Sequence, residues 1–187
     1  MMIKFFKILI LIFLLSNTHS NALIEIDITR GNLDPLPIAV SPLFTDEKSK
    51  KNSVDEIEIK DIGFEISSVI ENNLKISGLF NPLNNEAFLQ KPDIAHLKPR
   101  FEDWALIKAQ ALITGKVIIE KSKLKVEFRL WDILAGREML ALAFTTVPSN
   151  WRRVGHIISD KVYERLTGEL GYFDTRIIYV SKEGPKT

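Results

Sequence analysis

The sequence contains no cysteine. Disulfide bonds, thiolate metal sites, a cysteine nucleophile and a cysteine-linked lipid anchor are therefore excluded. Histidine is also scarce: His19, His96 and His156 lack the spacing of an H-E-x-x-H zinc motif. A metal or histidine-based catalytic site is thus not indicated, and for His156 we expect a capping or packing role.

The chain has no marked excess of either charge. Its 25 Lys and Arg residues and 24 Asp and Glu residues give a formal net charge of +1, so nucleic acid is not indicated as a partner. No G-x-S-x-G, Walker or G-x-G-x-x-G motif occurs, and the carboxylates of Asp103, Asp132, Asp160 and Glu164 form no evident acid–base pair. We therefore expect no catalytic residues, no metal and no cofactor, and predict that the protein is not an enzyme.

The first 22 residues have the pattern of a secretory signal peptide. Lys4 and Lys7 precede an apolar run from Ile8 to Leu15, and Ser20-Asn21-Ala22 provides small residues for cleavage. The apolar run is shorter than the roughly 20 residues that span a bilayer. We expect cleavage after Ala22 and a periplasmic mature chain without stable membrane insertion; an uncleaved N-terminal anchor is the alternative.

Residues 23–33, LIEIDITRGNL, alternate apolar and polar side chains before a Gly-Asn turn. Ile24, Ile26 and Ile28 share one face, which is typical of a half-buried strand. Such a segment near a free terminus either pairs permanently at the edge of its own sheet or detaches and adds to the sheet of another protein. The pattern alone favours the permanent edge strand.

The whole sequence has 187 residues and 45% hydrophobic content, which predicts one globular domain or slightly more. Alternating or apolar runs predict strands over 38–44, where Pro42 interrupts the run, and over 112–147, where they form a meander. Helical spacing predicts helices from Asp61 to Gly78, from Phe101, and from Asn150 to Gly168. The polar, charged residues 45–60 predict a surface loop, with the start of a strand or helix near its end.

These elements together predict an α+β fold. We expect a two-layer sandwich in which a mixed or antiparallel sheet carries helices on one face. The helix from Asn150 is the organising element, because Val154, Ile158, Val162 and Leu166 form one apolar stripe that requires a sheet to cover it. We expect Asn150 and Asp61 to cap their helices, and Gly168 to end the last one.

The residues around this last helix resemble the TolB family of the Tol-Pal system. The resemblance covers the helix, its exit and the strand after it: Arg152-Arg153, His156, Ile158-Ser159-Asp160, Tyr163, Leu166-Thr167-Gly168, Gly171, Phe173 and Thr175-Arg176-Ile177. Three shorter phrases are similar to the same family: Ser77-Gly78-Leu79-Phe80, Leu112-Ile113-Thr114-Gly115 and Phe128-Arg129-Leu130-Trp131-Asp132.

The resemblance implies an N-terminal α+β domain over residues 23–175 whose mobile strand, 23–33, binds the C-terminal domain of TolA. It implies an adaptor role in outer-membrane integrity and in constriction during cell division. The implied partner-binding residues are Leu23, Ile24, Glu25, Ile26, Asp27, Ile28, Thr29, Arg30, Gly31, Asn32 and Leu33.

Residues 176–187 correspond to the linker and first strand of the family's C-terminal β-propeller, which carries the site for the lipoprotein Pal. A propeller blade needs four strands, so the propeller is not encoded in this sequence and Pal binding is not carried over. We expect a fragment rather than a free-standing N-terminal domain.

One alternative comes from another functional class. Trp104, Trp131 and Trp151 would surround a cleft in a periplasmic module that binds a small molecule or a cell-wall glycan. A buried anchor is the commoner use of a residue such as Trp104. Arg152 and Arg153 could bind a phosphate or carboxylate at the helix start, but fixing the helix to neighbouring loops is the better-supported interpretation.

Overall fold

The computed structural model of the protein describes residues 24–26 and 34–175. The expected signal peptide, most of the expected partner-binding strand 23–33 and the expected propeller strand in 176–187 lie outside the described residues. Within the described ranges, no helix has the length and apolar character needed to cross a bilayer.

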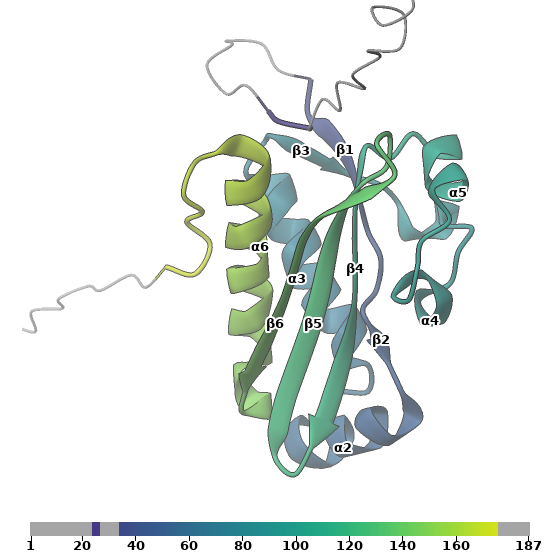
Figure 1. Ribbon diagram of the computed structural model, residues 1–187. Helices are drawn as coiled ribbons and strands as arrows, with labels where there is room; N and C mark the ends of the chain where they lie inside the picture. The colour runs from purple at the N-terminus through teal and green to yellow at the C-terminus, as the bar shows by residue number, and fades with distance from the viewer. Residues whose placement is uncertain (1–23, 27–33, 176–187) are drawn as a thin grey trace, which may run out of the picture.

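The centre of the fold is a six-stranded mixed sheet (Figure 1). Its strands are β1 (Leu36–Val40), β2 (Phe44–Thr45), β3 (Phe80–Pro82), β4 (Ala111–Glu120), β5 (Lys123–Asp132) and β6 (Arg137–Thr146). The order is β3-β1-β4-β5-β6, with β2 also paired to β4. β1 runs parallel to β3 and β4, β2 runs parallel to β4, and β4, β5 and β6 form an antiparallel meander. The predicted α+β fold and meander are confirmed.

Two long helices, α3 (Ile62–Ile76) and α6 (Trp151–Thr167), cover one face of the sheet (Figure 1). The predicted apolar stripe of α6 is confirmed, because Val154, Ile158, Val162 and Leu166 are at most 3% exposed. They pack with alternate residues of β5, such as Leu124 and its neighbours on the same face, in the main core. Burying each such side chain contributes about 1.5–3 kcal/mol, so α6 is a principal source of stability.

Shorter helices cover part of the opposite face. These are η1 (Asn85–Ala87), α4 (Pro92–Ala95) and α5 (Phe101–Leu106). They enclose a second apolar cluster in which Ala39 and Leu112 point away from the main core. Trp104 is 1% exposed there, and its Nε1 donates to Gln90 Oε1 at 3.1 Å. The predicted role of Trp104 as a buried anchor is confirmed.

The expectation of a surface loop over residues 45–60 is wrong, because α2 occupies Glu47–Ile57. Asp46 caps this helix by accepting from Ser49 N at 2.7 Å, and these hydrogen bonds lower the pKa of Asp46. The buried face of α2 is polar: Ile119 N donates to Ser49 Oγ at 3.1 Å and Asn52 Nδ2 donates to Ile119 O at 2.7 Å. A helix that docks through hydrogen bonds has no apolar stripe to reveal it in the sequence.

The boundaries of α3 and α6 and the start of α5 agree with the predictions, with one correction. Asp61 caps α3 by accepting from Phe64 N at 3.1 Å, and Gly168 ends α6 in the left-handed region at φ 76°. Asn150 does not cap α6 with its side chain, however. It ends a short 3-10 turn, η2 (Pro148–Asn150), and its Nδ2 donates to Thr146 Oγ1 at 3.0 Å. The turn directs the side chain back towards β6 and away from the first turn of α6.

The first turn of α3 lies against the connection between β1 and β2. A Cβ added at Gly63 would lie 1.9 Å from Leu43 O and 2.5 Å from Thr45 Oγ1. In the same contact, Ser67 Oγ accepts from Leu43 N at 2.9 Å. Because the nearest atom belongs to the backbone, a side chain at position 63 forces the helix and the connection apart.

We therefore expect Gly63→Ala to destabilise the fold by about 2 kcal/mol or more, although alanine has the better helix propensity by about 1 kcal/mol. Urea unfolding would measure this change. Ser68→Ala, at a half-buried position of the same helix, is the matched control and should change the free energy of unfolding by less than about 0.5 kcal/mol. Equal stability of the Gly63→Ala variant and the native chain would show that the contact is not tight.

Candidate partner-binding site

The described part of the N-terminal segment, residues 24–26, lies against the last turn of α6. Ile26 N donates to Leu166 O at 2.7 Å. The last four carbonyl groups of a helix have no partner within the helix, and Ile26 satisfies one of them. Ile24 and Ile26 are half-buried against the main core, whereas Glu25 is exposed. The predicted alternation is thus seen for these three residues, but they belong to no strand of the sheet.

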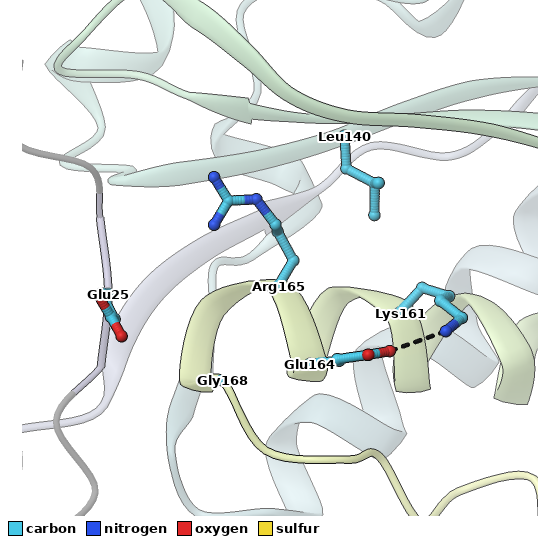
Figure 2. Close-up of a pocket in the computed structure, with 6 residues that line it drawn as sticks. All are labelled: Glu25, Leu140, Lys161, Glu164, Arg165 and Gly168. Carbon is cyan, nitrogen blue, oxygen red and sulfur yellow. Dashed lines mark hydrogen bonds and ion pairs between the residues drawn. The ribbon is translucent and has the colours of Figure 1, made fainter.

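A cavity of about 410 Å³ lies beside this segment, between α6 and β6 (Figure 2). Its lining residues are Glu25, Leu140, Lys161, Glu164, Arg165 and Gly168. Figure 2 shows Leu140 and Arg165 directed into the space between the helix and the strand. Lys161 Nζ pairs with Glu164 Oε2 at 2.7 Å, and Arg165 Nε donates to Met139 O at 3.3 Å. Among the polar residues that line the cavity, Lys161 and Glu164 thus form an ion pair within α6, and Arg165 joins α6 to β6.

The contacts of residues 24–26 with the other described residues are weak in energetic terms. One backbone hydrogen bond contributes about 1 kcal/mol and each half-buried isoleucine about 1 kcal/mol. Ordering the backbone of a residue opposes this by about 1–2 kcal/mol. The favourable and unfavourable contributions are similar in size, so the segment can leave its position on α6 at little cost to the rest of the fold.

The chain that follows α6 is held much more firmly to the same helix. Asp160 Oδ1 accepts from Phe173 N at 2.7 Å, and Oδ2 accepts from Asp174 N at 3.1 Å. Arg153 donates to both carboxylate oxygens of Asp174, which raises the pKa of Arg153. A Cβ at Gly171 would lie 2.4 Å from Asp160 Cα. The expected role of Arg153 in fixing the helix to a neighbouring loop is confirmed.

The two histidines outside the expected signal peptide have structural contacts. Asn73 Nδ2 of α3 lies 2.9 Å from His156 Nδ1 and donates to Ser159 Oγ at 3.0 Å. His156 therefore links α6 to α3, as the packing role predicts. His96 stacks on Phe44 with ring centroids 4.5 Å apart. Within the described ranges, no group of three metal-ligating side chains could hold an ion.

The structure does not bring the three tryptophans together around a cleft. Trp104 and Trp131 belong to the cluster under α5, and Trp131 Nε1 donates to Thr114 Oγ1 at 2.9 Å. Trp151 packs against the main core on the other side of the sheet, and Arg152 covers its ring at 4.8 Å. These three residues therefore do not form the aromatic cleft that the alternative interpretation requires.

Comparisons with known proteins agree with the fold. Residues 24–139 match the family model of the TolB amino-terminal domain. The chain is 70% identical over 181 residues to the Tol-Pal system protein TolB of Pelagibacter ubique (strain HTCC1062), an alignment that covers 97% of this chain and 41% of that relative. The crystal structure of TolB from Acinetobacter baumannii is similar in fold, with a TM-score of 0.60 at 20% identity, over 75% of this chain and 30% of that one. The chain thus spans less than half the length of both.

We expect Ile26→Ser to release the N-terminal segment without unfolding the domain, because the substitution removes apolar contact from an attachment of marginal stability. A spin label on Glu25→Cys would report this as a change from restricted to rapid motion, and the absence of native cysteine makes the labelling specific. The control carries the same label at position 25 together with Lys161→Ser, and its motion should stay restricted. Restricted motion in the Ile26→Ser chain would show that other contacts hold the segment.

The contacts of the C-terminal chain lead to a second prediction. Asp160→Ala removes the acceptor of two backbone N–H groups, and we expect a loss of about 1–3 kcal/mol in the free energy of unfolding. Asp174→Ala removes only an exposed ion pair and should cost less than about 1 kcal/mol. Thermal unfolding of both variants would compare them. A larger effect of Asp174→Ala would contradict the assignment of Asp160 as the main contact.

Proposed function

The chain belongs to the family of TolB amino-terminal domains, and from this premise we propose that it is a periplasmic adaptor of the Tol-Pal system. In this proposal residues 23–33 bind the C-terminal domain of TolA, in support of outer-membrane integrity and of constriction during cell division. Residues 1–22 are the cleaved signal peptide, 23–175 form the adaptor domain, and 176–187 lead towards a propeller that carries the Pal site.

The observation that carries the proposal is the weak attachment of residues 24–26. The segment lies outside the sheet and is held by Ile26 N on Leu166 O and by two half-buried side chains. A segment that detaches can add to the edge of another sheet, where main-chain hydrogen bonds give affinity and alternate side chains give specificity. Ile24, Ile26 and Ile28 would supply the apolar contacts, and the backbone would supply the ladder.

The energetics of such a switch are favourable. A partner shifts an equilibrium between docked and released states only by its difference in affinity for the two. Because the docked state is marginal, a small part of the binding energy suffices to keep the segment released. The same partner would have to supply far more to displace residues 171–174, which Asp160 and Arg153 hold by several charge-assisted hydrogen bonds.

Titration calorimetry against the TolA C-terminal domain tests this proposal. We expect residues 23–187 to bind and residues 34–187 not to bind. In the longer chain, Ile24→Ser with Ile26→Ser should weaken binding by about 30-fold, since each isoleucine contributes about 1 kcal/mol. Glu25→Gln is the matched control, because Glu25 projects away from the isoleucine face, and it should change affinity by less than about threefold.

Three outcomes separate the alternatives. Equal binding by the long and short chains would move the site away from residues 23–33. Equal weakening by Glu25→Gln and by the double isoleucine substitution would contradict the role of the apolar face. Absence of binding by the folded long chain would remove the support for TolA as its partner.

A further inference from the structure

A second cavity lies at the other end of the sheet, on the outer face of the β4–β5 hairpin. Ile118 of β4 pairs with Lys125 of β5, and Lys125 pairs with Thr145 of β6, so the three side chains form one row across three strands. The alternate residues of β5, Leu124 and Val126, point into the main core. The hairpin pocket has a volume of about 450 Å³ and is lined by Ile118, Glu120, Lys121, Lys123, Lys125 and Thr145.

The hairpin pocket has an excess of positive charge, since its lining contains three lysines and one glutamate. Glu120 lies opposite Lys123 in the strand register but approaches Lys48 Nζ of α2 at 3.5 Å. Lys125 pairs with Glu127 at 2.6 Å. Among the ion pairs of the described residues, none involves Lys121 or Lys123. Within the described part of the chain, the exposed ammonium groups of Lys121 and Lys123 thus line the pocket without an ion-pair partner.

The backbone at the hairpin turn gives an independent indication. Lys121 and Ser122 form a two-residue turn and have φ values of 49° and 58°. Both central positions of such turns favour Asn or Gly, because the left-handed region is unfavourable for other residues by about 1 kcal/mol. A lysine at this position is less stable than an asparagine would be, and strain of this kind often accompanies a functional site.

The hairpin is also held in place by α2. Asn52 Nδ2 donates to Ile119 O at 2.7 Å, and Ile119 N donates to Ser49 Oγ at 3.1 Å. At the turn itself, Ser122 Oγ donates to Glu56 Oε1 at 3.0 Å. These contacts join the turn and the end of β4 to a helix, so the backbone that carries the lysines is fixed before any ligand arrives.

We propose that the hairpin pocket binds a phosphate ester, either the headgroup of an anionic phospholipid or a soluble phosphate. Lysine binds phosphate as a point charge, and among the described residues Lys121 and Lys123 have no carboxylate partner. The hydroxyl of Thr145 can donate to a phosphate oxygen, and Ile118 offers an apolar wall to the remainder of the ligand. The site is independent of the proposed TolA-binding segment.

Two binding assays identify the source of the phosphate. Co-sedimentation with phosphatidylcholine vesicles, with and without phosphatidylglycerol, tests the lipid headgroup, and calorimetry with glycerol phosphate tests the soluble ester. Lys121→Gln with Lys123→Gln should weaken binding by about 30-fold, about fivefold for each lysine. Lys75→Gln with Lys98→Gln changes net charge equally at exposed positions elsewhere and should have less than about a twofold effect. Binding by the native chain should also weaken as salt is added.

Lys121→Asn separates charge from turn geometry. Asparagine suits the left-handed turn, so Tm should rise by about 2 °C while phosphate affinity falls by about fivefold. This opposite response of stability and binding is not expected of a lysine that is merely solvated.

The outcomes are distinct. If the Lys121→Gln, Lys123→Gln chain loses binding only to the phosphatidylglycerol vesicles, the ligand is a lipid headgroup. If it loses binding only to glycerol phosphate, the ligand is a soluble ester. Either result supports the site. Absence of binding by the native chain in both assays overturns the proposal. An equal loss of binding in the Lys75→Gln, Lys98→Gln control also overturns the proposal. Unchanged phosphate affinity of the Lys121→Asn chain does the same.

Discussion

The burial of one face of α6 is the constraint on which much of this structure depends. Val154, Ile158, Val162 and Leu166 are almost completely removed from solvent against the sheet, and Asn73 joins the helix to α3 through His156 and Ser159. With its position and rotation fixed in this way, the helix presents its remaining groups in a defined arrangement. Leu166 O receives the N-terminal segment, while Arg153 and Asp160 receive the chain that follows the helix.

The two segments attached to α6 differ in strength, and the difference suits different tasks. In contacts with other described residues, 24–26 contribute one neutral hydrogen bond and two half-buried isoleucines. Residues 171–174 use a carboxylate that accepts two N–H groups, an arginine pair and a glycine for which no Cβ would fit. Under the proposed function, a partner recruits the first segment while the second keeps its course along the helix. This asymmetry is what an adaptor with a detachable N-terminal strand requires.

Periodicity predicted α3, α6 and the β4–β6 meander, and with them the α+β class. Of these elements, α3, α6, β4 and β5 bury apolar side chains. It missed α2, because the buried positions of that helix are Ser49 and Ser53. Ser49 docks on Ile119 N of β4, and Ser53 donates to Ile59 O just beyond the end of the helix. It assigned Asn150 to a cap, whereas a 3-10 turn directs that side chain to Thr146. The acceptor for Ile26 is a backbone carbonyl, which has no signature in a sequence. The resemblance to the family includes Arg153, Asp160 and Gly171, but only the structure shows that these residues meet around one loop.

The positions of the two proposed sites make them compatible. Residues 24–26 lie at the C-terminal end of α6, and the β4–β5 hairpin lies at the opposite end of the sheet (Figure 1). The segment rests on the face covered by α6, whereas Ile118, Lys125 and Thr145 form a row on the outer face. Release of the segment removes no contact from the hairpin, whose supports come from α2. A protein partner and a phosphate-bearing surface could therefore be held at the same time by one rigid sheet, with neither site depending on the state of the other.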